Sequence, residues 1–315
     1  MFKLSTLITA LILTLSIIFS VSGCKAHEDS TSSVISSEIS SNETSNLSSK
    51  VSSEESSSDI SSTVSTVSKP TVTYKYPKAV EAAKGKSSQR QGYGFGLKTD
   101  ESNRPILALN QQNKYKHLNF LSVMNEEKTV YLTFDNGWEN GLTPSYLDTL
   151  KEKGVKAVFF LNKSYVVANK AIVKRMIDEG HVVANHSANH QDLTKLSADE
   201  IACDIMDLHN YMLREFNYEM HLFRPPSGTY SEVVLAVAKA LNYKTVEWSF
   251  AYSDWDTENQ WEHEKALNYM KEKLCGGGIY LLHTVSSTTG AVLGDFIDYA
   301  KSEGYTLSLL ENTQY

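Results

Sequence analysis

Two histidines, His186 and His190, lie four residues apart in the sequence His-Ser-Ala-Asn-His. If this segment forms a helical turn, both imidazoles lie on one face and can bind the same cation. Such a pair is more often found on a protein surface than in a metal site, so the spacing is weak evidence by itself. Asp135 and Asn136, which end an apolar segment, add candidate oxygen ligands. The chemistry expected of these residues is that of a bound divalent metal.

A second set of polar residues points to acid–base chemistry. His283 follows the apolar residues 279–282 and, taken alone, is equally well explained as a buried histidine with a satisfied hydrogen bond. Asp254 favours a functional role, because a neighbouring carboxylate orients an imidazole and raises its pKa. Arg224 precedes two prolines, whose stiff backbone fixes its direction. The alternative role of this arginine is a structural ion pair.

All these residues lie at the ends of predicted strands. From Thr129 onward, short apolar segments rich in Val, Phe, Tyr and Leu alternate with amphipathic segments. This alternation predicts parallel strands with right-handed crossovers, arranged as a barrel or an open sheet. Catalytic groups of such folds collect at the carboxyl ends of the strands, so the candidates should share one rim. The predicted strands are 129–135, 157–162, 181–186, 221–226, 244–250, 279–284 and 306–310.

Helix-boundary signals lie between these strands. Thr143 is expected to cap a helix with Pro144 at its first position. Ser197 and Glu200 predict a capping box before a long amphipathic segment. Gly154 lies where a helix C-cap is expected.

The N-terminal residues predict a targeting segment. An apolar stretch at 7–19 ends in Val21-Ser22-Gly23-Cys24, which predicts a signal peptide at residues 1–23. The cysteine after Ser-Gly also resembles a bacterial lipobox, in which Cys24 would be lipidated and become the mature N-terminus. The alternative is an uncleaved transmembrane anchor. In both cases the rest of the chain is expected outside the cytoplasm and attached to the cell membrane.

Composition divides the remaining chain. Residues 28–68 are dominated by Ser, Thr and Glu, with almost no aromatics, and predict a disordered tether, which we place at 24–70. Residues 71–128 carry weak signals and form an N-terminal extension of the domain predicted at 129–315. Residues 91–96 of the extension alternate glycine with aromatics, but they lack the preceding strand and following helix of a phosphate loop.

Charge and cysteine content narrow the possible partners. The chain has 315 residues and a formal net charge of −7, which argues against nucleic acid, because its binding proteins normally carry a basic patch. The spacing of Cys203 and Cys275 suggests neither a disulfide framework nor a zinc site. Cys203 is expected as a small core residue, and a disulfide between the two cysteines stays an open alternative.

Together, the candidate residues resemble the polysaccharide deacetylase family, carbohydrate esterase family four, over residues 130–310. Five short motifs occur in the order found in the family, which makes the resemblance specific. These motifs are Thr133-Phe134-Asp135-Asn136-Gly137, His186-Ser187-Ala188-Asn189-His190, Arg224-Pro225-Pro226-Ser227-Gly228, Asp254-Trp255 and Leu281-Leu282-His283.

Two positions depart from the family pattern. Asn136 stands where the family has a metal-binding aspartate, and Ser227 replaces an aromatic residue. Asn136 with residues 138–141 is similar to the delta-lactam-biosynthetic de-N-acetylases, which act on muramic acid in spore cortex. The Gly-aromatic segment and residues 284–286 also resemble that subgroup, whereas the lipobox and the Ser-rich tether are not expected of it.

The resemblance implies an α/β fold, a distorted (β/α) barrel of about seven strands. It also implies one divalent metal, with zinc as the expected ion. His186, His190 and Asn136 would hold this metal, with water in an open position. The implied activity is hydrolysis of N-acetyl groups from amino sugars of cell-wall peptidoglycan, with N-acetylmuramic acid as the expected substrate. The similarity to the spore-cortex subgroup also implies a link to sporulation.

The resemblance further implies the acid–base roles. Asp135 would be the general base, oriented by Arg224, and His283, tuned by Asp254, would be the general acid. The residues expected to contact the sugar are Trp138, Pro226, Trp255 and Leu281. Trp248 is a further stacking candidate, for which core packing is an equal alternative.

Two other functions stay open. One is a deacetylase of N-acetylglucosamine, chitin oligomers or acetylated xylan. The other is an inactive wall-binding lipoprotein in which Asn136 is a damaged ligand. The presence of Asp135, Arg224, Asp254 and His283 favours catalysis, because a binding protein needs no acid, base or orienting group.

Overall fold

The computed structural model describes residues 73–311. The predicted signal peptide, Cys24 and the predicted tether at 24–70 lie outside these residues. Between residues 73 and 311, no helix is both long enough and apolar enough to span a bilayer.

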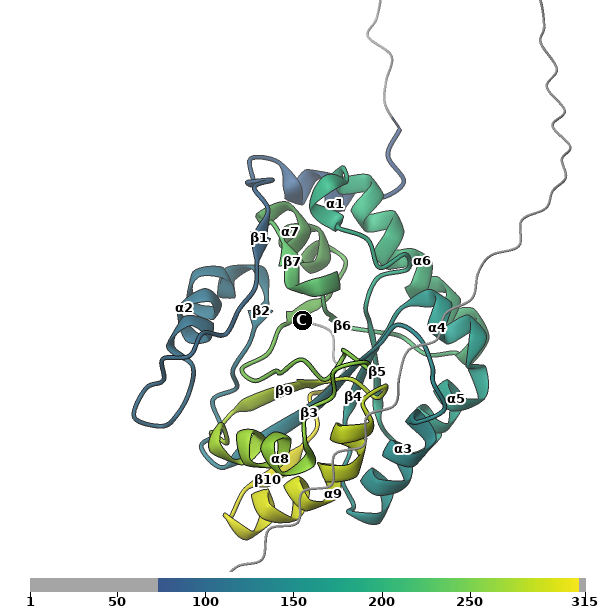
Figure 1. The fold of residues 1–315 in the computed structure, drawn as a ribbon. Coiled ribbons are helices and arrows are strands. Elements are labelled where there is room, and N and C mark those ends of the chain that lie inside the picture. The colour runs from purple at the N-terminus through teal and green to yellow at the C-terminus, as the bar shows by residue number, and fades with distance from the viewer. Residues whose placement is uncertain (1–72, 312–315) are drawn as a thin grey trace, which may run out of the picture. The chain divides into compact units, whose positions relative to one another are not determined.

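A curved sheet of parallel strands forms the centre of the described chain (Figure 1). Strand β3 (Thr129–Asn136) has three parallel partners, which are β4 (Val158–Leu161), β9 (Gly278–Leu282) and β10 (Thr306–Ser308). Beyond β4 the sheet continues in the order β5 (Val182–Asn185), β6 (Leu222–Phe223), β8 (Lys244–Val246) and β2 (Phe120–Leu121).

The sheet curls until its two ends approach each other. After β8 the chain meets β9, where the amide of Leu281 donates to the carbonyl of Phe250 at 2.9 Å and Phe250 forms a parallel bridge with Tyr280. Val123, just after β2, forms an antiparallel bridge with Gly278. These contacts make the sheet a distorted barrel, and they confirm the predicted fold class.

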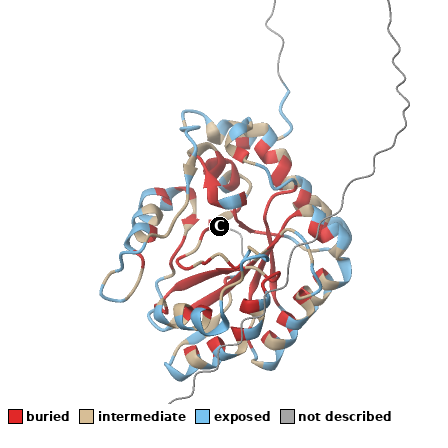
Figure 2. Ribbon diagram, in the orientation of Figure 1, coloured by how far each residue is buried: buried red, intermediate tan, exposed pale blue. Residues whose placement is uncertain are grey.

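The strands are apolar on both faces because both faces are covered. Val130, Leu132 and Phe134 of β3 pack in the cluster shared with the helices, whereas Tyr131 belongs to a smaller cluster made by strand residues. Buried residues follow the strands and the inner sides of the helices (Figure 2). Burial on two faces explains why these strands read as continuous apolar segments in the sequence.

Nine α-helices of the described residues lie around the sheet (Figure 1). They are α1 (Pro77–Ala83), α2 (Ile106–Tyr115), α3 (Thr143–Glu152), α4 (Lys163–Ala168), α5 (Lys170–Asp178), α6 (Ala198–Phe216), α7 (Glu232–Ala240), α8 (His263–Glu272) and α9 (Ser287–Ser302). Short 3-10 turns cover Lys116–Leu118, Leu193–Lys195 and Pro226–Gly228.

The seven predicted strands are present, but those predicted at 221–226 and 244–250 are much shorter and end at Phe223 and Val246. Strand β6 ends at Phe223, because the prolines that follow Arg224 carry no amide hydrogen for strand pairing. Strands β2, β1 (Gln91–Gly92) and β7 (Thr229–Tyr230) were not predicted. Each has two residues, too few for a periodic pattern to show.

The prediction for Thr143 is wrong, whereas the capping box is confirmed. Thr143 is the first residue of α3 rather than its cap, and Leu142 occupies the cap position without a side-chain bond. The Thr143 hydroxyl is buried and contacts the hydroxyl of Thr284 at 2.7 Å instead. Ser197 and Glu200 form both hydrogen bonds of the capping box at the start of α6.

The described part of the predicted extension, residues 73–128, packs directly against the rest of the fold. Strand β2 belongs to the main sheet, and β1 pairs antiparallel with β7. Cys203 is half-buried rather than part of the core, and it and the buried Cys275 are both free thiols, so no disulfide joins them.

Candidate active site

A cavity of about 600 Å³ lies at the carboxyl ends of the barrel strands. It collects most of the residues that the sequence indicated. Predicted residues that line it are Asp135, Trp138, His186, His190, Trp248, Trp255, Leu281 and His283. Four others are buried outside its lining, namely Asn136, Arg224, Pro226 and Asp254.

Asp135 is held by Arg224. Nη1 of Arg224 donates to Oδ1 of Asp135 at 2.6 Å. The guanidinium is fully buried, donates through Nε to the carbonyl of Val246, and lies 4.1 Å from the ring centroid of Phe160. Burial would raise the pKa of Asp135, but Arg224 and the nearby histidines outweigh it and hold this pKa below its usual range. Asp135 is therefore an ionised carboxylate facing the cavity.

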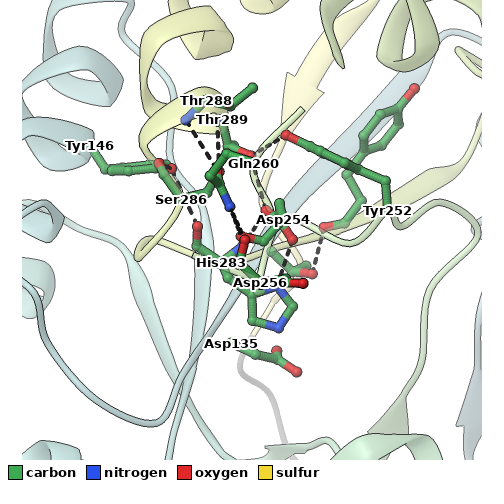
Figure 3. Close-up of polar contacts among 12 residues, drawn as sticks. Asp135, Tyr146, Tyr252, Asp254, Asp256, Gln260, His283, Ser286, Thr288 and Thr289 are labelled. Carbon is green, nitrogen blue, oxygen red and sulfur yellow. Dashed lines mark hydrogen bonds and ion pairs between the residues drawn. The ribbon is translucent and has the colours of Figure 1, made fainter. Parts of the chain in front are cut away.

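His283 is held by Asp254 in the same way. Nδ1 of His283 lies 2.8 Å from Oδ1 of Asp254, and the backbone amide of His283 donates to Oδ2 at 2.8 Å (Figure 3). Burial would lower the pKa of His283, but the buried carboxylate outweighs it and raises this pKa above its ordinary value. The imidazole thus retains a proton at higher pH than a free histidine and directs Nε2 away from Asp254.

Side chains that the sequence did not single out hold Asp254 in place (Figure 3). The hydroxyl of Thr289 donates to Oδ2 of Asp254 at 3.0 Å, and Nε2 of Gln260 donates to its backbone carbonyl at 2.9 Å. Oε1 of Gln260 in turn accepts from the hydroxyl of Ser286 at 2.5 Å. The signal available in the sequence was the run of Ser and Thr after His283.

The histidine loop, residues 186–191, is not the helical turn that was predicted. Ser187 and His190 have φ values of 67° and 50°, in the left-handed region that non-glycine residues seldom adopt. Oδ1 of Asn185 accepts from the Ser187 amide, and the Ser187 hydroxyl accepts from the His190 amide. These side-chain bonds replace the backbone bonds of a helix. The two rings still meet, with centroids 4.8 Å apart.

The surroundings of His186 favour a neutral ring. Its Nδ1 lies 2.8 Å from the carbonyl oxygen of Arg224, an acceptor, so Nδ1 carries the hydrogen and Nε2 has the free lone pair. Nε2 lies 3.5 Å from Oδ2 of Asp135. Burial is the largest effect and lowers the pKa of His186 to about 4. A neutral imidazole with one nitrogen fixed by an acceptor is the form that binds metals.

Asn136 follows Asp135 at the end of β3 and is buried. Its Nδ2 donates to the hydroxyl of Thr284 at 2.5 Å and lies 3.5 Å from that of Thr143. Its Oδ1 is buried and has no hydrogen-bond partner among residues 73–311. A buried amide oxygen of this kind is unusual, because such acceptors are normally satisfied.

The residues present fit a divalent metal with a neutral donor set. Within the described residues, no three His, Cys, Asp or Glu side chains are grouped as a metal site. Asn is not one of these residue types, and Oδ1 of Asn136, buried without a partner in the described residues, offers a neutral oxygen donor in addition to the imidazoles of His186 and His190. Imidazole nitrogens suit zinc and other borderline metals.

Aromatic side chains stand at the cavity mouth. Trp138 and Trp255 are 52% and 60% exposed, respectively, which suits stacking on a sugar. Trp248 combines both roles considered for it, since it lines the cavity and packs edge-on against Tyr93 at 4.9 Å. Pro226 is buried and does not line the cavity; Ser227 does instead.

One buried acid had no predicted role. Glu247, which follows β8, is 0% exposed, and neither carboxylate oxygen has a hydrogen-bond partner in the described part of the chain. Burial raises its pKa well above the ordinary value, which favours the protonated, neutral form of this side chain. Only its backbone carbonyl accepts from Arg224, at 3.3 Å. The only sequence signal was a single acidic residue within an apolar strand.

Comparison with known proteins gives consistent matches. A family model described as polysaccharide deacetylase matches residues 122–246. The chain is 38% identical over 237 residues to the peptidoglycan-N-acetylmuramic acid deacetylase PdaA of Bacillus subtilis (strain 168). The matched region covers 74% of this chain and 90% of that protein. The chain is also 36% identical over 181 residues to the peptidoglycan-N-acetylglucosamine deacetylase PgdA of Listeria monocytogenes, covering 56% of this chain but 37% of that protein.

Solved structures show the same fold. The structure of B. subtilis PdaA, a family 4 carbohydrate esterase, matches with a TM-score of 0.67 and 36% identity, covering 71% of this chain and 96% of that one. A family 4 pseudoenzyme from Bacillus anthracis, BA3943, matches with a TM-score of 0.57 and 29% identity, covering 61% of this chain and 67% of that one.

Proposed function

Because the chain belongs to the polysaccharide deacetylase family, whose members hydrolyse amide bonds, we propose that it removes N-acetyl groups from N-acetylmuramic acid of peptidoglycan. The observation that carries this proposal is the pair of acid–base couples at one cavity. Asp135 is bound to Arg224 at 2.6 Å, and His283 is bound to Asp254 at 2.8 Å. In one couple the lowered pKa of Asp135 favours a base without its proton, and in the other the raised pKa of His283 favours an acid with its proton.

The proposed reaction uses these two states directly. Asp135, ionised because its pKa is lowered, takes the proton from the attacking water. His283, whose pKa is raised, gives a proton to the amine nitrogen as the carbon–nitrogen bond breaks. Arg224 orients the carboxylate of Asp135, and Asp254 orients the imidazole of His283. The products are acetate and the free amino sugar.

The proposed cofactor is a divalent metal ion, with zinc as the first candidate. Its proposed ligands are His186, His190 and Oδ1 of Asn136. Enzymes of this family generally depend on a metal. When bound, such an ion polarises the acetyl carbonyl and lowers the pKa of water. The neutral His186 ring and the unpartnered Asn136 oxygen support this assignment.

N-acetylmuramic acid is favoured over N-acetylglucosamine by the extent of the matches. The likeness to the muramic acid deacetylase spans 74% of this chain at 38% identity, including part of the N-terminal extension. The likenesses to two N-acetylglucosamine deacetylases, from Listeria monocytogenes and Bacillus cereus, span 56% and 58% of this chain at 36% and 33% identity. Mass spectrometry of purified peptidoglycan fragments incubated with the protein tests the choice. Acetyl loss from muramic acid supports the proposal, and loss from glucosamine alone would replace the substrate.

Loss from neither sugar, with or without added zinc, would favour the inactive wall-binding lipoprotein. The likeness to a family 4 pseudoenzyme gives this alternative a structural precedent. The two intact acid–base couples argue against it, since a binding protein has no use for them.

We further propose that the protein is anchored outside the cytoplasm by a lipid on Cys24. The support is the Val21-Ser22-Gly23-Cys24 sequence after an apolar stretch. Replacing Cys24 by Ser should release the protein from membranes in cell fractionation. A C24S variant that stays in the membrane fraction at the wild-type level would indicate an uncleaved helix.

A further inference from the structure

The histidine loop, residues 186–191, needs support from outside itself. It forms no helix and no strand, and it contains two non-glycine residues with positive φ. Left-handed conformations of this kind are unfavourable and persist only where surrounding contacts impose them. The loop must nevertheless bring two imidazoles together at the cavity.

Helix α6 supplies that support through one side chain. Asp204 is 5% exposed and directs its carboxylate at the loop. Oδ1 accepts from the backbone amide of Ala188 at 2.8 Å, and Oδ2 accepts from the side-chain amides of Asn189 and Gln191 at 2.7 and 3.0 Å. All three donors lie between or beside the two histidines. In the described chain, no ion pair joins Asp204 to Lys, Arg or His, and the hydrogen bonds of its carboxylate all go to the loop.

A second contact from the same helix fixes the start of the loop. Nδ2 of Asn185 donates to the carbonyl of Ile205, the residue after Asp204, at 2.8 Å. Asn185 also accepts from Ser187 and thereby sets the first left-handed residue. Asp204 controls the remainder of the loop, which carries His190.

From this geometry we propose that Asp204 is a positioning residue, which holds His190 beside His186 so that both rings can bind one cation. The cation rests on the proposed function, but the placement of the rings does not. A carboxylate is required because it accepts at both oxygens. An Asn at this position would turn an N–H group toward the amide of Ala188 or toward the amides of Asn189 and Gln191, and would lose at least one bond.

The test compares Asp204→Asn with Asp204→Glu in the full chain. Zinc affinity is measured in competition with a chelator, and partners that orient metal ligands typically change metal affinity by about 10- to 100-fold. We expect the zinc affinity of D204N to be lower than that of the wild type by a factor in this range. D204E should recover part of the lost affinity, because a glutamate keeps both acceptor oxygens. The matched control is Asp207→Asn on the same helix, whose carboxylate pairs with Lys163 and, among the described residues, makes no hydrogen bond to the loop. D207N should bind zinc like the wild type.

A metal-free measurement keeps the two proposals separate. Nitrogen-15 NMR of the labelled histidine rings reports the surroundings of His186 and His190 without zinc. D204N should shift the His190 ring signals, and D207N should leave them unchanged. If the wild type binds no zinc, the proposed cofactor fails, and the NMR comparison still decides the role of Asp204.

Two results would overturn the positioning role. One is D204N with wild-type ring signals. The other is D204N with wild-type zinc affinity and a lowered melting temperature, which would make Asp204 a structural residue only. If D204N does not fold, Asn189→Ala can be used instead, because it removes the hydrogen bond from Asn189 to Asp204 and leaves Asp204 in place. It should weaken zinc binding by less than tenfold, and unchanged affinity together with unchanged ring signals would contradict the proposal.

Discussion

The two halves of the cavity are built on different principles. The acid–base half consists of Asp135, Arg224, Asp254 and His283, and each of its catalytic groups meets an oppositely charged partner at 2.6 to 2.8 Å. The histidine half consists of His186, His190 and Asn136. It contains a neutral ring and an amide oxygen with no partner in the described residues.

This difference indicates what each half lacks. The acid–base half is complete in the polypeptide, because each charge is compensated by another side chain. The histidine half presents lone pairs without hydrogen-bond donors, which is the arrangement expected where a cation completes the set. Substitutions in the first half should therefore change turnover, and substitutions in the second should change ligand binding first.

The largest effect is expected for Asp135→Asn. General base catalysis contributes about 10²- to 10⁴-fold, and Asn cannot accept the proton from water, so deacetylation should fall by this factor. Bound metal and the circular dichroism spectrum should stay as in the wild type. If the variant loses the metal together with activity, Asp135 belongs to the histidine half. That result would contradict the division of the cavity into two halves.

His283→Ala should give the next largest effect, and it should depend on the substrate. An amine must receive a proton to leave, so amide hydrolysis should fall by about 10²- to 10³-fold, within the usual range for a general acid. An activated acetyl ester has a leaving group that departs with little protonation, so its hydrolysis should fall far less. Equal losses on the two substrates, measured as kcat/KM, would remove the acid role from His283.

Asn136→Asp tests the histidine half. A carboxylate adds a negative charge to a neutral donor set, and we expect zinc to bind about tenfold more tightly, as for other changes around a metal site. The measurement is a competition titration at fixed pH with the wild type as reference. Weaker binding would mean that Oδ1 of Asn136 does not face the metal and is unpartnered for another reason.

Glu247→Gln should have the smallest effect on turnover and a measurable effect on stability. The pKa of Glu247 is raised in the folded state, so above the unfolded value of 4.5 the folded protein retains a proton that the unfolded chain releases. Wild-type stability should therefore decline as pH rises, and this decline should be smaller in the variant. We expect E247Q to be more stable than the wild type at pH 7 and nearly equal to it at pH 4, as measured by denaturant unfolding.

A constant difference between E247Q and the wild type over this pH range would show that Glu247 is not an unpartnered acid. It would also weaken the contrast drawn between paired and unpartnered groups. The Gln side chain keeps nearly the same volume, so packing is a minor contributor to the comparison.

The elements of the barrel were predictable because their signals are local. An apolar strand that ends in a polar residue, such as Asp135 or His283, places that residue at the rim whatever surrounds it. The matching partners, Arg224 and Asp254, were also predictable from charge. The family resemblance then assigned their roles.

Other features were set by contacts between distant segments. The histidine loop was predicted as a helical turn from its spacing, but it is held in another conformation by Asp204 of helix α6, which lies 16 positions after Ala188. Thr143 matched a helix cap, yet its hydroxyl turns to Thr284, which lies 141 positions later. Pro226 belongs to a motif that reaches the cavity through its neighbour Ser227. No local pattern encodes such choices.

The pairing of β1 with β7 has a consequence for how the chain can be divided. Tyr93, next to β1, donates its hydroxyl to the carbonyl of Trp248 at 2.5 Å, and its amide donates to the carbonyl of Gly228 at 2.7 Å. A protein trimmed at residue 129 would lose this brace, leave a tryptophan of the cavity wall without backing, and expose β8 as a bare sheet edge prone to self-association. The first residue of the smallest working enzyme therefore lies well before the first motif of its chemistry.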